Sequence, residues 1–523
     1  MRKFRRLIFL FFVIYGFGFG NLAWPQAVDI QLDTTEKAGS GASGEEVETE
    51  TDSTYFVKIP GLDNSLVRKL SLSECIELAL ENNRILKIYT LSNKSARIRL
   101  EMAESRFLPS GFVTGGRDES RNDDLGYLII KQDVSSEIGL SRRLETGGNV
   151  SVSMENGMSE SSNNTGVTNY ASGVGMKINH PLMRGIGIEV NTIPIKRAKE
   201  SANISLLQIK RNMINLITNI ESIYWDLILV YEDYRIQQEA LKRTQQLLEI
   251  NKSLIEAGRM AAQEIVQTES DVASREISVA NAENDIINTQ ISLQAQLDLA
   301  DRILIQPTTR MTFEPIQVKA EECLKKAYEF RPDWIIQNKY LEIEKMNLIV
   351  AKNDTRYELD SYAGLSSNAT SIKGLSDSFQ QAFKFNSLTW NVGLSFTFPF
   401  NKQVLRNGFI LQQLSHDRQA LQVAELADNI RIWVENAVRH VEYSLKQVQL
   451  AQKAKELSIK KLKLEEEKMR VGRSSNFQVI SYQRDLTNAQ NRELQAIARY
   501  LKAIGRLEET MGTTLLKWNI AIE

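Results

Sequence analysis

Apolar residues recur along residues 206–234 at alternating spacings of three and four. The series is Leu206, Ile209, Met213, Leu216, Ile220, Ile223, Leu227, Val230 and Tyr234. This spacing is typical of a helix that packs in a coiled coil. A weaker series of the same kind comprises Ile430, Val434, Ala437, Val441, Val448 and Ala451. The two series predict long helices of about 50 residues, which span roughly 75 Å at 1.5 Å per residue.

Both apolar series stop at a Gly-Arg pair. The pairs are Gly258-Arg259 and Gly472-Arg473, and a second helical pattern follows each, over residues 265–299 and 479–511. Glycine readily adopts the left-handed conformation that ends a helix. We therefore expect two long antiparallel helical hairpins with tips at Gly258 and Gly472. Taken alone, the heptads favour an ordinary soluble coiled coil.

The last third of the chain repeats the middle third. A shift of 214 positions aligns residues 204–297 with 418–511 without a gap, and it places Asp271 on Asp485. A shift of 248 places Cys75 on Cys323. These shifts predict two copies of one helical unit, residues 70–303 and 304–523.

A second pattern, strict alternation, covers residues 388–400. The apolar members are Leu388, Trp390, Val392, Leu394, Phe396, Phe398 and Phe400, and small or polar residues lie between them. Residues 170–182 alternate in the same way just before the first long helix. A strand of about ten residues with one apolar face and one small, polar face is the unit of a transmembrane barrel. We expect Trp390, Val392, Leu394, Phe396 and Phe398 to face lipid.

Further strands are predicted at 107–115 and 359–366. The first copy also has 34 extra residues before its long helix, since 95 positions separate Pro109 from Ile204 and only 61 separate Tyr357 from Arg418. These residues predict a hairpin with arms at 134–144 and 150–154. Four to six strands cannot close a barrel, which needs about eight, and an open edge cannot lie in lipid. Copies of the chain must then share one barrel, unless the strands form a small soluble sheet.

The N-terminus carries a targeting pattern. Four basic residues precede an apolar run over residues 7–19, which is short for a membrane span and predicts a signal peptide over residues 1–27. Residues 28–69 are acidic and rich in Gly, Ser and Thr, which predicts a disordered linker.

Composition narrows the chemistry. The charge is balanced, with 64 basic and 65 acidic residues, which argues against a nucleic-acid partner. The three histidines have no metal-ligand spacing, and Cys75 and Cys323 are expected to be buried and unreactive. No phosphate-binding loop or nucleophile elbow is present. We expect neither an enzyme nor a cofactor.

The order of motifs resembles one known family. The motifs are residues 70–83, 106–109, 180–185 and 257–259, which return in weaker form at 320–332, 351–360, 398–400 and 470–473. Together they resemble the TolC-type outer-membrane efflux and secretion channel family, over about residues 66–515. The resemblance implies a mostly α fold with β: a homotrimer whose helices form a hollow α-barrel in the periplasm. Above it, four strands per chain would form a shared 12-stranded β-barrel in the outer-membrane lipid.

The resemblance also implies partners and a passive role. Short helices near 72–83, near 321–330 and at the C-terminus would form an equatorial belt. The tips at Gly258, Arg259, Gly472 and Arg473 would meet a periplasmic adaptor, which links the channel to an inner-membrane pump in an efflux or type I secretion system. Drugs, metal ions and exported proteins all use such ducts, so the cargo stays open.

The chain departs from the family at the periplasmic constriction. Members often carry carboxylates six and nine residues after the second tip glycine, where this chain has Gln478 and Ser481. The first copy has Glu264 and Gln267 there, so Glu264 is the one acidic candidate, and simple surface exposure explains it equally well. The alternative function is a periplasmic coiled-coil adaptor or scaffold anchored by its N-terminus, which leaves the alternation of residues 388–400 unexplained.

Overall fold

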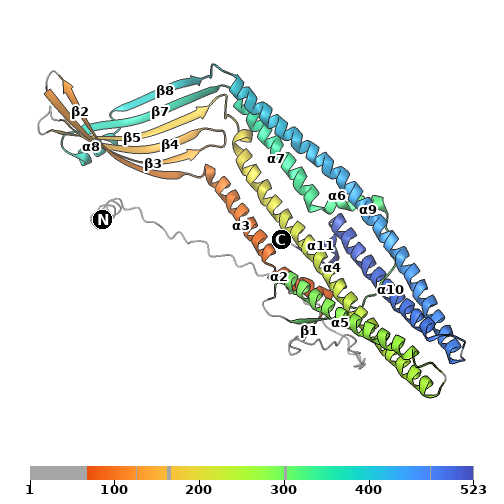
Figure 1. Cartoon of the computed structure of the whole chain (residues 1–523). Helices are drawn as coiled ribbons and strands as arrows, with labels where there is room; N and C mark the ends of the chain where they lie inside the picture. The colour runs from red at the N-terminus through yellow and green to blue at the C-terminus, as the bar shows by residue number, and fades with distance from the viewer. Residues whose placement is uncertain are drawn as a thin grey trace, which may run out of the picture. The chain divides into compact units, whose positions relative to one another are not determined.

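The computed structural model describes residues 67–124, 127–161, 167–258, 260–299, 303–471 and 473–521, without the side chains of 122–129. The predicted signal peptide and the predicted linker up to residue 66 lie outside this part. A six-stranded sheet, a two-stranded sheet and a set of helices make up the described chain (Figure 1).

The described residues form ten α-helices, four of which make up the two predicted hairpins. They are α2 (Leu72–Asn82), α3 (Arg84–Glu104), α4 (Ile188–Glu256), α5 (Glu264–Leu297), α6 (Ala320–Phe330), α7 (Pro332–Asp354), α8 (Leu375–Ala382), α9 (Gln403–Arg470), α10 (Asn476–Met511) and α11 (Thr514–Lys517), with a 3₁₀ turn at Ser105–Phe107. Helix α4 is followed by α5 and α9 by α10, and α9 and α10 run side by side in Figure 1. The two copies predicted from the sequence therefore have the same order of long helices.

The long helices exceed the predicted length. Helix α4 has 69 residues and α9 has 68, which corresponds to roughly 100 Å each. The prediction of about 50 was too short because α4 begins at Ile188, before the apolar series, and includes Pro194. Pro194 has no backbone N–H to donate, yet α4 continues through it.

The heptad positions supply the core. Ile220 and Leu227 are fully buried in a cluster with α2 and α5, and Val434 is buried in the matching cluster of the second copy. By composition, α4 is also apolar enough to cross a membrane, but half of its most apolar stretch is buried against other elements, as in the core helix of a helical bundle. The apolar series thus encodes packing between helices.

The two cysteines are buried at equivalent places, as predicted. Cys75 lies in the core of the first copy and Cys323 in that of the second. Burial raises the pKa of the Cys75 thiol to about 12, and burial also raises the pKa of the Cys323 thiol. Both thiols therefore stay protonated near neutral pH, where a thiol is a poor nucleophile.

The end of the predicted linker is a strand. Strand β1 (Val67–Leu70) pairs in parallel with β6 (Leu304–Pro307). The prediction of disorder up to residue 69 was therefore wrong for its last three residues. A partner more than 200 positions away stabilises these four residues, and Tyr224 donates a hydrogen bond of 2.9 Å to the Leu70 carbonyl.

The six-stranded sheet is antiparallel throughout. Its strands, in spatial order, are β2 (Ser110–Asp124), β3 (Tyr127–Arg143), β4 (Asn149–Ser161), β5 (Thr168–Pro181), β7 (Glu358–Ser371) and β8 (Leu388–Thr397). The four strands per chain implied by the family resemblance are corrected to six. The added strands are β3 and β4, the hairpin that the 34 extra residues predicted. The sheet leaves β2 and β8 as its edges.

Strands β2 to β4 are longer than predicted, and one helix was missed. Strands β2 and β4 continue into polar residues beyond the alternation that marked them, and β3 begins earlier, at Tyr127. Helix α8, between β7 and β8, packs on the sheet through a hydrogen bond of 2.9 Å between the buried hydroxyls of Ser378 and Ser172. Eight residues are too few for periodicity to identify a helix.

Candidate functional site

Strand β8 has one apolar, exposed face. Trp390 is 72% exposed and Val392 71% exposed, and Leu394 and Phe396 are exposed beside them. Phe398 lies just beyond the end of β8 and is also exposed, with its ring 5.5 Å from that of Phe396. Large apolar side chains of a folded chain left this exposed mark a contact with lipid or with another protein.

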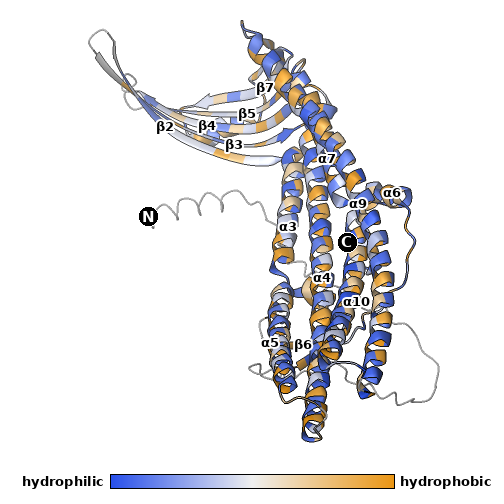
Figure 2. Ribbon diagram, turned by 45° about the vertical axis from the view of Figure 1, so that its right-hand side comes forward, coloured by the Kyte–Doolittle hydropathy of each residue, from blue (hydrophilic) through white to orange (hydrophobic). Residues whose placement is uncertain are grey.

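The opposite face of β8 is small and polar. Its members include Asn391, Gly393 and Ser395. The ring of Tyr362 on β7 lies over Gly393, where an added Cβ would come within 2.3 Å of it. This face therefore allows close packing of the neighbouring strand. Hydrophobic and hydrophilic residues are interspersed along the strands in Figure 2.

The tip of the first hairpin is partly described. Gly258 has a φ of 69° and its amide donates to the Ile255 carbonyl at 2.9 Å. An added Cβ at Gly258 would meet nothing within 4 Å. Gly258 is therefore favoured here by its left-handed backbone conformation, and not by a lack of space for a side chain.

The tip of the second hairpin has a different construction. Arg473 is exposed and its amide donates to the Lys468 carbonyl at 2.9 Å. Ser475 caps α10, since its hydroxyl accepts from the Gln478 amide at 3.3 Å. Arg259 and Gly472 lie outside the described residues.

The four constriction candidates are not assembled within one chain. Glu264 and Gln267 are exposed on the first turn of α5, whereas Gln478 and Ser481 are half-buried on α10. Among the described residues, no hydrogen bond or ion pair joins these four side chains to one another.

A buried polar layer near the tips was not predicted. The Thr268 hydroxyl on α5 accepts from the Asn251 amide of α4 at 2.8 Å and from the Asn476 amide of α10 at 2.9 Å. All three side chains are buried. Both amide nitrogens are hydrogen-bonded, whereas the amide oxygens of Asn251 and Asn476 have no partner among the described residues. The bond from Asn476 to Thr268 links the second hairpin to the first.

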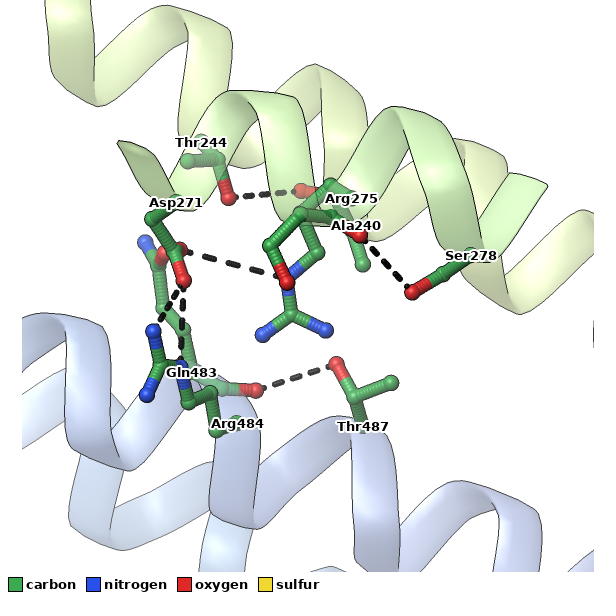
Figure 3. A network of polar contacts seen from close by, with 9 residues as sticks. Ala240, Thr244, Asp271, Arg275, Ser278, Gln483, Arg484 and Thr487 are labelled. Atoms are coloured by element: carbon green, nitrogen blue, oxygen red, sulfur yellow. Dashed lines mark hydrogen bonds and ion pairs between the residues drawn. The ribbon is translucent and has the colours of Figure 1, made fainter. Parts of the chain in front are cut away.

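An ion pair lies beside this layer (Figure 3). The Asp271 side chain on α5 is 1% exposed and is paired with Arg484 on α10, whose side chain is 51% exposed. Arg275 approaches the second carboxylate oxygen of Asp271 at 3.9 Å, and burial lowers the pKa of the Arg275 guanidinium. Sequence alone gave no signal for this pair because its partners are 213 positions apart.

A second buried carboxylate ties the C-terminus to α4. Glu221 accepts from Lys517 at 3.1 Å and from the indole N–H of Trp518 at 2.9 Å. Its carboxylate lies so close to Gly505 that a Cβ there would approach within 2.6 Å. The repeat places Glu435 at the equivalent position, where it is exposed, so only one copy uses this contact.

Known proteins share this architecture. Residues 75–297 match the family model described as outer membrane efflux protein. The chain is similar to the structure of the Campylobacter jejuni CmeC outer membrane channel, at 15% identity and a TM-score of 0.65, over 92% of this chain and 94% of that one. It is also similar to the outer membrane protein VceC from Vibrio cholerae, at 13% identity and a TM-score of 0.62, over 84% and 96%. No curated protein matches the chain.

The chain thus has the fold of the solved outer-membrane channels, and its first repeat matches the outer membrane efflux protein model. Residues 75–297 match the outer membrane efflux protein model and the fold matches those of solved outer-membrane channels, so the predicted resemblance to TolC-type channels is confirmed. The Campylobacter jejuni structure is described as an outer membrane channel, and the family model as an outer membrane efflux protein. The alternative of a periplasmic adaptor finds no support.

Proposed function

We propose that the protein is the passive outer-membrane duct of a tripartite efflux or type I secretion system. The observation that carries this proposal is the sheet, which has one exposed apolar face and one small, polar face and continues directly into two helical hairpins. A sheet of this kind separates lipid from a water-filled lumen. The duct itself performs no catalysis, and the pump supplies the energy.

The sheet's two edges support assembly into a homotrimer. Strands β2 and β8 leave one side of their backbone without a partner strand among the described residues. In lipid, each such backbone group costs several kcal/mol unless it is hydrogen-bonded. Edge-to-edge pairing of three copies closes the sheet, and outer-membrane lipid then covers Trp390, Val392, Leu394, Phe396 and Phe398.

The hairpin tips are proposed to dock a periplasmic adaptor that leads to an inner-membrane pump. The docking residues are Gly258, Arg259, Gly472 and Arg473. Support comes from Gly258, whose left-handed turn is open to solvent, and from the exposed Arg473. Three copies would bring three Glu264 side chains to the same level, which makes Glu264 the acidic candidate for a constriction, with Gln267, Gln478 and Ser481 beside it.

Residues 1–27 would then serve as the export signal and 28–66 as an acidic spacer before the first repeat. The second repeat would begin near residue 304, where β6 starts.

Membrane fractionation tests the proposed function. The full chain is expressed in a Gram-negative host, and inner and outer membranes are separated by density. The account expects the protein in the outer-membrane fraction, extractable only with detergent, and ion conductance when the purified protein is added to a planar lipid bilayer in KCl. Recovery in the inner membrane or in the soluble periplasm would contradict it.

A further inference from the structure

The extra hairpin, β3 and β4, occupies the middle of the sheet. Strand β3 pairs with β2 along its length, β4 pairs with β5, and the two pair with each other. Strands β2 and β5 do not pair directly, since β3 and β4 separate them. A hairpin outside the barrel wall would leave β2 and β5 as neighbours, which is not the arrangement here.

The apolar face of the sheet continues across this hairpin. Side chains that lie opposite each other in a ladder point to the same face of a sheet. One row in register is Gly111, Leu140, Val152, Met176, Leu365 and Trp390, and the next is Val113, Ile138, Met154, Val174, Ser367 and Leu388. Leu140, Val152 and Ile138 are exposed, as Trp390 is. The hairpin thus carries its own apolar residues in the same rows as β8.

The other face of the hairpin is polar and charged. Glu137 on β3 lies opposite Glu155 on β4, and Lys177 on β5 is 3.4 Å from Glu155. These residues share a face with Asn391 and Ser395 by the same register. Charged groups are tolerated in a membrane barrel on the side of the lumen.

The turn of the hairpin is fitted to the junction between β5 and α4. The Thr146 carbonyl accepts from the Gly187 amide at 3.0 Å, and the Thr146 hydroxyl is 3.0 Å from His180 Nε2. Gly147 has a φ of 106°, and a Cβ there would lie 2.3 Å from the Gly185 carbonyl. The turn between β3 and β4 is therefore packed closely against the junction between β5 and α4.

The face pattern also shows why the added element is a pair of strands. Removal of β3 and β4 would bring β2 beside β5 with Val113 and Val174 still on the same face, because two strands keep both the direction and the pleat. Inserting a hairpin therefore adds two strands to the sheet and leaves every other side chain on the face it had before, lipid or lumen.

We infer that three copies of this chain form one 18-stranded barrel, in which β2 of each copy pairs with β8 of the next. The inference rests on the proposed trimer, with six strands from each copy. Barrel diameter grows about linearly with strand number, so the outer-membrane mouth is about 1.5 times as wide as a 12-stranded one at equal tilt. The added wall presents Glu137 and Glu155 to the lumen.

Electron cryomicroscopy of the full chain, purified in detergent, tests this count. The inference expects a trimer with 18 strands around the barrel. A trimer with 12 strands and the hairpin outside the wall would overturn the inference and leave the proposed duct standing. A particle that is not a trimer would overturn the proposed function as well.

A matched pair of variants tests the hairpin's faces in cells. Ile138→Lys places a charge on the apolar face, and Glu137→Lys places one on the polar face one residue away. The inference expects a several-fold loss of outer-membrane trimer for Ile138→Lys. Glu137→Lys should form as much outer-membrane trimer as the unchanged protein. It should also make the pore more selective for anions, which is measured as a shift of the reversal potential in a KCl gradient across a planar bilayer. Equal assembly of both variants, with no shift for Glu137→Lys, would show that the hairpin does not line the pore.

Discussion

Arg484 Nε on α10 donates to the carboxylate of Asp271 on α5 at 3.1 Å, across the contact between the two helical hairpins. Asp271 is almost fully buried, whereas Arg484 keeps half of its side chain in solvent. The pair joins the first repeat to the second near the tips. A buried carboxylate is tolerated only while its partners remain.

Replacing Arg484 by Ala should destabilise this contact. Asp271 would retain only Arg275 at 3.9 Å, so the expected loss is about 1–3 kcal/mol. The midpoint of thermal loss of the helical circular dichroism signal, in detergent, measures it. Lys463→Ala, at an exposed position of α9, is the control and should change little.

A double variant separates the charge from the packing. Asp271→Asn removes the buried charge, so Asp271→Asn combined with Arg484→Ala should recover part of the stability lost by Arg484→Ala. A double variant less stable than either single one would show that Arg484 acts through something other than Asp271.

The faces of β8 can be tested by lysine at adjacent positions. Leu394→Lys places a charge on the apolar face and should cost about 2–4 kcal/mol near the membrane midplane, which lowers the amount of protein in the outer membrane. Ser395→Lys should be milder because Asp360 lies opposite Ser395. Immunoblots of outer-membrane fractions compare the two. Equal amounts would contradict the assigned faces.

Alanine at two glycines that have free space around them tests whether the backbone conformation at the first tip requires glycine. Gly258→Ala adds a Cβ at a φ of 69° and should lower stability by about 1 kcal/mol. Gly408→Ala, inside α9 and also without a neighbour within 4 Å, should instead raise it by about 0.5–1 kcal/mol. Thermal denaturation compares the variants, and a gain in stability for both would remove the conformational reason for Gly258.

The tip arginines test adaptor docking. Arg259→Glu combined with Arg473→Glu should leave the protein folded and in the outer membrane, because Arg473 is exposed beside the turn. If the tips dock an adaptor, the charge reversal should abolish export in the native host. Export at the full rate, with normal amounts of protein, would exclude both arginines from the docking surface.

The sequence predicted what repeats along the chain. The heptads identified Ile220 and Leu227 as core, and the alternation of residues 388–400 identified the exposed face of Trp390 and Val392. Both patterns arise because one face of a helix or strand meets a single environment over many turns or pairs. Such a regularity is visible in one segment without knowledge of its partners.

Contacts between distant segments could not be read in this way. Strand β1 has four residues and depends on β6, and Asp271 resembles its repeat equivalent Asp485 in sequence. Yet Asp271 is buried against the other hairpin, whereas Asp485 pairs with Lys461 at 2.9 Å on the surface. The two copies differ because only one of these carboxylates meets the facing hairpin.

The mass of the detergent-solubilised protein tests the central claim most directly. One chain cannot close its sheet, so light scattering corrected for bound detergent should give about three times the mass of the mature chain, whose full-length form is 59.4 kDa. The account predicts this trimer as the stable species at micromolar concentration. A well-behaved monomer, with its sheet edges unpaired, would contradict it.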